Sequence, residues 1–154
     1  MRVSRRIIIG GGLAIGAVTV AGIANPNLFY SLLAQQVQGG TLSAPEAHAA
    51  TLAGDITLID IRRPDEWSAT GSGEGAHRLD LRRADFADEL AKLTGGNRDA
   101  PIALICARGV RSSRLANRLT EAGFTQIIDV PEGMLGSAAG PGWLARGLPV
   151  VTDN

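Results

Sequence analysis

The sequence predicts an α/β domain in which a parallel sheet carries helices on both faces. Two short apolar runs, at residues 56–61 and 102–105, have the length and composition of buried parallel strands. Segments with apolar residues at helical spacing alternate with these runs. Such alternation leads to right-handed crossovers, and therefore to parallel strands between two layers of helices. The chain of 154 residues is long enough to bury a core of this kind.

Residues 1–24 are interpreted as a signal peptide or a membrane anchor. A basic start is followed by an uncharged apolar run at residues 7–24. Small residues at Gly22 and Ala24 are typical of a secretory signal cleaved after Ala24, whereas an uncleaved run would be an anchor. Adjacent arginines in the basic start also resemble a twin-arginine export signal. Because positive residues stay inside, both interpretations place the domain in the periplasm or outside the inner membrane.

Residues 25–40 are predicted to be a linker, and the folded domain is predicted at residues 41–152. The linker contains Pro, Asn, Gln and Gly, and its apolar patch at residues 28–30 is compatible with a juxtamembrane helix. The domain opens with Ser43 and Glu46, which have the spacing of a capping box. This spacing predicts a short helix at the start of the domain.

The two histidines are not assigned to a site. His48 lies in the first helix of the domain without an acid, cysteine or second histidine at ligand spacing, so it is predicted to be a surface residue. His77 follows a glycine-rich turn and is predicted to be a turn or rim residue rather than a base. The sequence therefore predicts no metal site.

The apolar run at residues 56–61 leads into Asp60-x-Arg62. Asp60 and Arg62 are interpreted as a buried ion pair that fixes the end of the strand, with a structural rather than a catalytic role. A short helix is predicted over residues 64–69, with Trp67 as its packing anchor.

Three further elements complete the predicted alternation. An amphipathic helix is expected over residues 80–93, and a buried strand over residues 125–130. Between them, the run at 102–105 is followed by a helix over residues 112–122, with Ser112 or Ser113 as its N-cap.

The only cysteine of the chain lies in the turn between the strand at 102–105 and the helix that follows. The turn reads Cys106-Ala107-Arg108-Gly109-Val110-Arg111-Ser112. The first N–H groups of a helix have no partner within the helix, and the positive end of its dipole favours an anion there. In parallel sheets, ligands bind at the carboxyl ends of the strands, which is where this turn falls.

Three features of this turn favour a thiolate at Cys106. Arg108 and Arg111 add permanent positive charge, and Gly109 lets the backbone curl so that successive N–H groups face inward. A helix N-terminus with nearby cations lowers a cysteine pKa from its usual value of about 8.5. The alternative is that Cys106 is a small buried hydrophobic residue, but that role would not call for a glycine and two arginines beside it.

The turn resembles the active loop of the rhodanese superfamily, in which a Cys, a Gly three positions on and an Arg five positions on recur. Residues 58–67, followed by Gly71 and Gly75-Ala76, are similar to the early signature of that family, and residues 143–150 are similar to its closing segment. The resemblance implies a parallel sheet of about five strands, and a structural role near the loop for Asp60 and Arg62. It implies Cys106 as the nucleophile. The implied substrate-binding residues are Ala107, Arg108, Gly109, Val110, Arg111 and Ser112.

The activity implied by the resemblance is sulfur transfer from thiosulfate or another donor to a thiol or cyanide, through a persulfide on Cys106. The partners are then a small anionic sulfur donor and a thiol acceptor, and no metal or organic cofactor is required. A single cysteine excludes a disulfide within the chain and a resolving cysteine in the same molecule. Any persulfide on Cys106 must therefore be discharged by another molecule.

Two alternatives to this enzyme stay open. Cysteine-dependent phosphatases use a similar anion loop, but they place five residues between Cys and Arg, whereas Cys106 and Arg111 enclose four. The second alternative is a persulfide carrier or redox-responsive binding module that forms a stable persulfide and turns over slowly with cyanide. The formal net charge of zero implies no nucleic acid as a partner.

Overall fold

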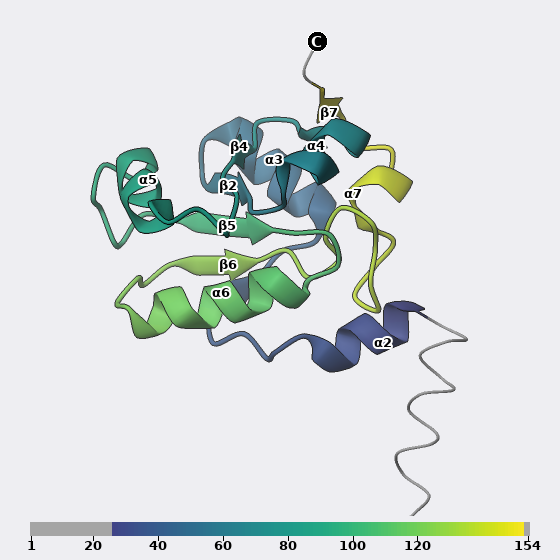
Figure 1. The fold of residues 1–154 in the computed structure, drawn as a ribbon, viewed down its shortest axis with the longest axis horizontal. Helices are drawn as coiled ribbons and strands as arrows, with labels where there is room; N and C mark the ends of the chain where they lie inside the picture. The colour runs from purple at the N-terminus through teal and green to yellow at the C-terminus, as the bar shows by residue number, and fades with distance from the viewer. Residues whose placement is uncertain (1–25, 153–154) are drawn as a thin grey trace, which may run out of the picture.

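The computed structural model describes residues 26–152, and its central element is a five-stranded sheet in which all neighbouring strands run parallel (Figure 1). The strand order is β1-β6-β5-β2-β4. The strands are β1 (Gly40–Thr41), β2 (Thr57–Asp60), β4 (His77–Arg78), β5 (Ile102–Ile105) and β6 (Ile127–Asp129). The predicted α/β class with a parallel sheet is confirmed, and β5, which leads to the cysteine, is the middle strand.

Side chains alternate along β5 and divide the core into two layers. Ile102 and Leu104 belong to the cluster that contains Leu90 and Leu115. Those two leucines come from the helices α5 (Phe86–Leu93) and α6 (Val110–Glu121). Ala103 and Ile105 belong to the other cluster, with residues of α3 (Ala44–Ala53) and α7 (Gly142–Ala145). Helices therefore cover both faces of the sheet (Figure 1).

A second, two-stranded sheet joins the C-terminal strand to a strand from the middle of the chain. After β2 the chain forms α4 (Pro64–Thr70) and then β3 (Ser72–Gly73), which pairs antiparallel with β7 (Val150–Val151). Gly73 must lack a side chain here, because a Cβ would lie 2.7 Å from the Trp143 ring. Trp143 is fully buried and donates through Nε1 to the carbonyl of Pro149.

The described part of the predicted linker is bound to the domain. It begins with helix α2 (Pro26–Leu33), which lies beside α6 (Figure 1). Beyond α2, the backbone N–H of Gln35 donates to Ser113 Oγ at 3.1 Å, and that of Gln38 donates to Asn117 Oδ1 at 3.0 Å. These bonds make the segment part of the folded unit rather than a free connector. The segment predicted for targeting, residues 1–24, lies outside the described residues.

Within residues 26–152, no helix has both the length and the apolar character needed to span a bilayer.

Two helices begin at other residues than the sequence pattern predicted. Helix α6 starts at Val110, because Gly109 adopts a left-handed conformation (φ 81°) and becomes the N-cap in place of Ser112 or Ser113. Helix α5 starts at Phe86 rather than near residue 80. The carboxylate of Asp80 accepts a bond from the Arg82 backbone N–H at 2.9 Å, and this local turn competes with the helix.

The prediction that His48 is a surface residue was wrong. Its side chain is 15% exposed, its Nε2 lies 2.8 Å from Glu74 Oε2, and its ring packs edge-on against Trp143. The reason is that α3 packs against α7, which brings a tryptophan distant in sequence to this face of the helix. His77 lies exposed in the edge strand β4.

Asp60 and Arg62 form a buried ion pair, with Arg62 Nη2 2.7 Å from Asp60 Oδ2. The side chains are 0% and 1% exposed. Arg62 also donates to Thr70 Oγ1 and to the Gly71 carbonyl, and Ser72 Oγ donates to the Asp60 carboxylate. The pair therefore ties the end of β2 to the end of α4 and the start of β3, with its polar atoms satisfied.

Replacing Asp60 by Asn should lower the free energy of unfolding by about 3–5 kcal/mol, because Arg62 would remain charged and buried beside a neutral partner. The measurement is urea unfolding of the full chain followed by circular dichroism. The control is Asp85→Asn, which removes the acid of an exposed pair with Arg83 and should leave the midpoint unchanged. An equally small effect of both substitutions would contradict a structural role for the buried pair.

Candidate active site

Cys106 lies directly after β5, at the carboxyl end of the middle strand of the sheet. The residue is 1% exposed. The segment around Gly133 holds the backbone of the turn, because the N–H groups of Met134 and Leu135 donate to the carbonyls of Cys106 and Ala107, each at 2.9 Å. A Cβ at Gly133 would lie 2.5 Å from the Ala107 carbonyl oxygen, so this close approach requires glycine.

Gly109 turns the chain from the cysteine loop into helix α6. Its φ of 81° lies in the left-handed region, and a Cβ there would clash with the carbonyl oxygen of Pro131. Because the helix begins at the next residue, the positive end of its dipole lies at the loop. The sequence pattern predicted a helix start at residue 112, so the structure places this positive end two residues nearer in sequence to Cys106.

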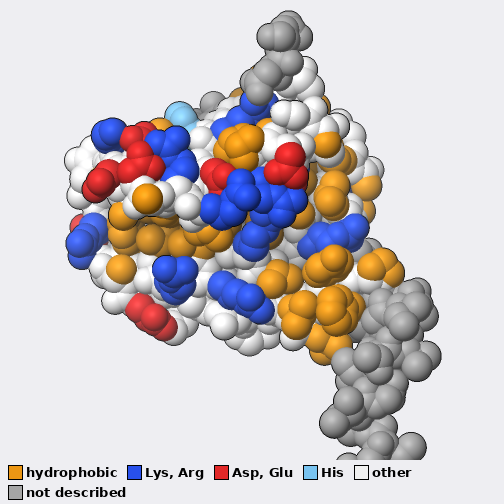
Figure 2. All heavy atoms as spheres, in the orientation of Figure 1, with side chains coloured by type: hydrophobic (Ala, Val, Ile, Leu, Met, Phe, Trp, Pro, Cys, Tyr) orange, Lys and Arg blue, Asp and Glu red, His pale blue; other side chains and the backbone are white. Residues whose placement is uncertain are grey.

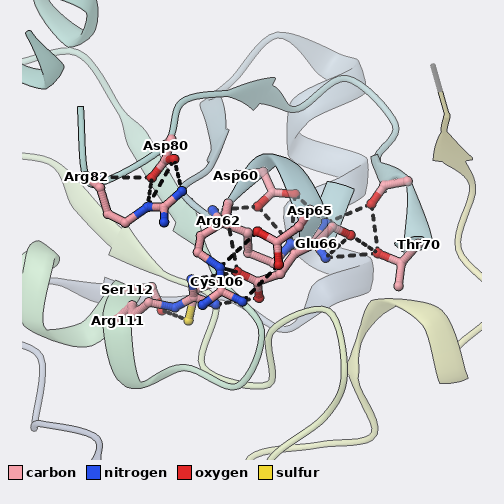
Figure 3. Close-up of polar contacts among 12 residues, drawn as sticks. Asp60, Arg62, Asp65, Glu66, Thr70, Asp80, Arg82, Cys106, Arg111 and Ser112 are labelled. Carbon is pink, nitrogen blue, oxygen red and sulfur yellow. Dashed lines mark hydrogen bonds and ion pairs between the residues drawn. The ribbon is translucent and has the colours of Figure 1, made fainter. Parts of the chain in front are cut away.

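Arg111 is fixed by Glu66 of α4 through two parallel hydrogen bonds of 2.8 and 2.7 Å (Figure 3). The bonds that Arg111 donates to the Glu66 carboxylate raise the pKa of Arg111, and its interaction with the Cys106 sulfur adds to this rise. Burial by itself would raise the pKa of Glu66, but the bonds from Arg111 and from the Arg63 backbone outweigh burial and bring it below its usual value. The guanidinium of Arg111 thus stays charged beside Cys106.

Arg108 makes contacts to two other parts of the chain. Its Nη1 donates to the carbonyl of Gly136 at 3.1 Å, and its guanidinium carbon lies 5.2 Å from the centre of the Tyr30 ring. The second contact is a cation–π interaction with a residue of α2. Helix α2 therefore contributes to the surroundings of the loop, although the sequence pattern indicated only a linker there.

An open pocket of about 370 Å³ has Cys106 in its wall. It is lined by Tyr30, Leu33, Arg63, Glu66, Cys106, Ala107, Arg108, Val110, Arg111 and Leu135. Figure 2 shows Lys and Arg side chains gathered with acidic ones near the middle of this face, and hydrophobic side chains toward the end of α2. The pocket therefore combines positive charge with apolar walls.

The structure divides the predicted loop residues into two groups. Ala107, Arg108, Val110 and Arg111 line the pocket together with the cysteine. Gly109 shapes the backbone without lining the pocket, and Ser112 is fully buried. The Sγ atom of Cys106 lies 3.5 Å from Ser112 Oγ. Among residues 26–152, no group of three His, Cys, Asp or Glu side chains has an arrangement that could hold a metal ion.

Several pocket residues were not assigned to the site from the sequence. Tyr30 and Leu33 reach it from α2, and Leu135 reaches it from the segment after β6. Glu66 lies within residues 58–67, which are similar to the early signature of the family, and this was the only sequence signal for it. Asp60 and Arg62 do not line the pocket; they support α4, which carries Glu66.

The family model that describes the rhodanese-like domain matches residues 43–139 of the chain. The chain belongs to the rhodanese-like domain family. This match covers both the strand that ends at Asp60 and the cysteine loop. The boundaries agree with a single rhodanese-like domain in the described part of the chain.

Curated relatives of this rhodanese-like domain are mostly uncharacterized proteins. YibN of Escherichia coli K12 is 29% identical over 101 residues, which are 63% of this chain and 62% of YibN. The chain thus spans less than two thirds of the length of that relative. The tRNA uridine(34) hydroxylase of Chlamydia abortus is 29% identical over 124 residues, which are 76% of this chain and 37% of the hydroxylase.

Solved structures similar to the rhodanese-like domain include two sulfurtransferases. The polysulfide-sulfur transferase of Wolinella succinogenes superposes with a TM-score of 0.60 at 26% identity, covering 92% of each chain. The thiosulfate sulfurtransferase of Pseudomonas aeruginosa superposes with a TM-score of 0.56 at 22% identity, covering 75% of this chain and 21% of that one. The second likeness shows the shared fold, and the first extends over most of both chains. At the level of the family, a sulfurtransferase is supported.

Replacing Glu66 by Gln should increase the reaction of Cys106 with iodoacetate, relative to iodoacetamide, by about fivefold, because removing one nearby negative charge is worth on the order of 1 kcal/mol to an anionic reagent. The reagents report on one site, since the chain has one cysteine. Glu89→Gln, which affects only a pair with Lys92 on α5, is the control. An unchanged ratio in Glu66→Gln would show that Glu66 does not screen the pocket from anions.

Proposed function

We propose that this rhodanese-like domain moves sulfane sulfur from thiosulfate, or another anionic donor, to a thiol or cyanide through a persulfide on Cys106. The observation that carries this proposal is the position of Cys106. It lies in the wall of a pocket, beside the N-terminal end of α6 and a guanidinium that Glu66 holds in place. These features favour a thiolate and an anionic substrate at the same point.

The first half-reaction is the attack of the Cys106 thiolate on the outer sulfur of thiosulfate. A new S–S bond forms at Cys106, the original S–S bond breaks, and its electron pair leaves with sulfite. The sulfite carries the charge that develops in this step, and positive groups at the pocket stabilise it. Arg108 and Arg111 line the pocket and supply such groups, as does the start of α6.

The second half-reaction is the attack of an acceptor on the outer sulfur of the persulfide. The bond between the two sulfur atoms breaks, and its electron pair returns to Cys106 as a thiolate. The acceptor must come from another molecule, because the chain has no second cysteine. Cys106 is buried but lies in the wall of the pocket, and the pocket gives an external acceptor a route to the sulfur. This scheme uses no metal or organic cofactor.

The Wolinella succinogenes neighbour, named as a polysulfide-sulfur transferase, makes polysulfide the second donor to test. Polysulfide, like thiosulfate, is an anion with a terminal sulfur that a thiolate can attack. Part of the pocket wall is apolar and includes Leu33, Val110 and Leu135. An apolar wall suits a chain of sulfur atoms better than a wall made only of charged side chains would.

The proposed location of the domain is outside the cytoplasm, secreted or attached to the inner membrane through residues 7–24. The apolar run of that segment ends just before α2. Helix α2 exposes Phe29, Leu32 and Leu33, and Leu135 is exposed beside the pocket. Figure 2 shows this hydrophobic region. An apolar surface directly after an apolar chain segment supports a position close to the bilayer.

Incubation of the full chain with thiosulfate should increase its intact mass by about 32 Da, one sulfur atom, and cyanide should remove this gain. The measurement is mass spectrometry of the intact protein. Cys106→Ser is the matched control and should show no adduct. A chain that is folded but gains no mass with thiosulfate or with polysulfide would contradict the proposed function. A stable adduct with slow turnover by cyanide would identify a persulfide carrier.

Replacing Arg111 by Ala should lower kcat/KM for thiosulfate about 10- to 100-fold, because a charge-assisted bond to an anion contributes about 1.5–3 kcal/mol. Arg111→Lys should fall between Ala and wild type, since an ammonium keeps the charge but not the paired bonds to Glu66. Arg118→Ala, an exposed arginine further along α6, is the control. Equal losses of activity and of stability in Arg111→Ala would show that Arg111 is structural.

A further inference from the structure

A third arginine, Arg63, lies in the wall of the pocket together with the two arginines of the cysteine loop. Arg63 is the N-cap residue of α4. Its side chain is 45% exposed, whereas the side chain of Arg111 is 32% exposed. Arg63 therefore places a positive charge in the part of the wall that lies nearer to solvent.

The carboxylate of Glu66 fixes the position of Arg63 relative to Arg111. The backbone N–H of Arg63 donates to Glu66 Oε2 at 3.1 Å, and the same carboxylate accepts both bonds from Arg111 (Figure 3). The Nε atom of Arg63 lies 3.6 Å from Glu66 Oε2. One carboxylate thus lies between two guanidinium groups, so the base of the Arg63 side chain has a defined place beside the cysteine loop.

The pocket wall carries more positive than negative charge. Its charged residues are Arg63, Arg108, Arg111 and Glu66. The negative charge of Glu66 is offset by the two bonds from Arg111. Arg108 donates to the carbonyl of Gly136 in the segment after β6, whereas Arg63 lies on α4. The charge of Arg63 therefore adds to that of the loop and attracts a second anionic group into the pocket.

The acid that pairs with the Arg63 guanidinium is Asp65. Arg63 Nε and Nη2 donate to Asp65 Oδ1 and Oδ2, each at 3.0 Å. The side chain of Asp65 is 66% exposed, and Asp65 is not among the residues that line the pocket. An exposed ion pair of this kind contributes little to stability, because water competes for both charges. A carboxylate that enters the pocket can therefore share or replace this partner.

The two substrates of sulfur transfer reach different depths of the pocket. The donor must reach Cys106 Sγ itself, which belongs to a residue that is 1% exposed. A persulfide extends Cys106 by one S–S bond of about 2 Å, so the acceptor has to reach only the outer sulfur. The body of the acceptor therefore lies nearer to solvent than that of the donor, at the depth of Arg63. A pocket of about 370 Å³ holds a thiol of a few carbon atoms between these points.

We propose that Arg63 selects small thiols that carry a carboxylate as the sulfur acceptors of this domain. The inference rests on the proposed function, because it requires the persulfide on Cys106. The acceptor thiolate attacks the outer sulfur, and a new S–S bond forms. The bond from the outer sulfur to Sγ breaks and leaves its electron pair on Sγ, while the proton of the outer sulfur leaves with the acceptor persulfide. The carboxylate of the acceptor is unchanged and binds the Arg63 guanidinium.

The test measures how fast two acceptors of equal length discharge the persulfide. The full chain is loaded with thiosulfate or polysulfide, freed of donor, and mixed with 3-mercaptopropionate or with the neutral 3-mercaptopropanol. Loss of the added sulfur from the intact mass gives a second-order rate constant for each acceptor. Arg63→Gln should lower the ratio of the two constants about fivefold, because one positive charge near the carboxylate is removed. The intrinsic reactivity of each thiol cancels, since every variant is measured with both.

Three further variants make the comparison specific. Arg83→Gln is the matched control, because Arg83 forms an exposed pair with an acid two positions on but does not line the pocket; its ratio should equal that of the wild type. Asp65→Asn removes the competing acid and should raise the ratio. Arg63→Lys keeps the charge and should retain most of the preference.

An unchanged ratio in Arg63→Gln would overturn the proposal. A larger effect of Arg63→Gln on loading by thiosulfate than on discharge would also overturn it, because Arg63 would then act on the donor. In both cases discharge by 3-mercaptopropanol would continue, which leaves the proposed function intact. A folded wild-type chain that gains no sulfur from either donor would contradict the proposed function and this inference together.

Discussion

The close packing of two backbone turns at the end of β5 is the constraint on which the site depends. The cysteine loop and the segment around Gly133 share two backbone hydrogen bonds, and glycines at 109 and 133 allow carbonyl groups to approach where a Cβ would clash. These contacts fix the position of Cys106 relative to the start of α6. Any side chain at either glycine would move the sulfur relative to the helix dipole.

Charge in the pocket is balanced rather than simply positive. Arg111 stays charged beside the cysteine, yet Glu66 binds both of its terminal nitrogens and fixes its direction. The guanidinium is therefore pre-organised, at the cost of part of its attraction for anions. On its buried side, the Cys106 Sγ atom lies 3.5 Å from the hydroxyl oxygen of Ser112. The sulfur therefore lies between a fixed guanidinium and a buried hydroxyl.

The walls of the pocket come from segments far apart in the chain. Helix α2 provides Tyr30, whose ring lies against Arg108. The segment after β6 provides Leu135, which also lines the pocket. A rhodanese-like domain needs the strand, loop and helix around its cysteine, but the shape of the entrance is set by such additions. Leu33, one of the exposed apolar side chains of α2, also lines the pocket.

The sequence by itself determined the α/β class, the turn with Cys106 and the arginines beside it, because strand, turn and helix signals are local patterns of apolar, glycine and charged residues. It also indicated the Asp60 and Arg62 pair, which lie two positions apart. Only the tertiary structure decided that Glu66 binds Arg111, 45 positions away, and that α2 lines the pocket. These contacts arise from the packing of separate elements, and no local pattern encodes which distant side chains then meet.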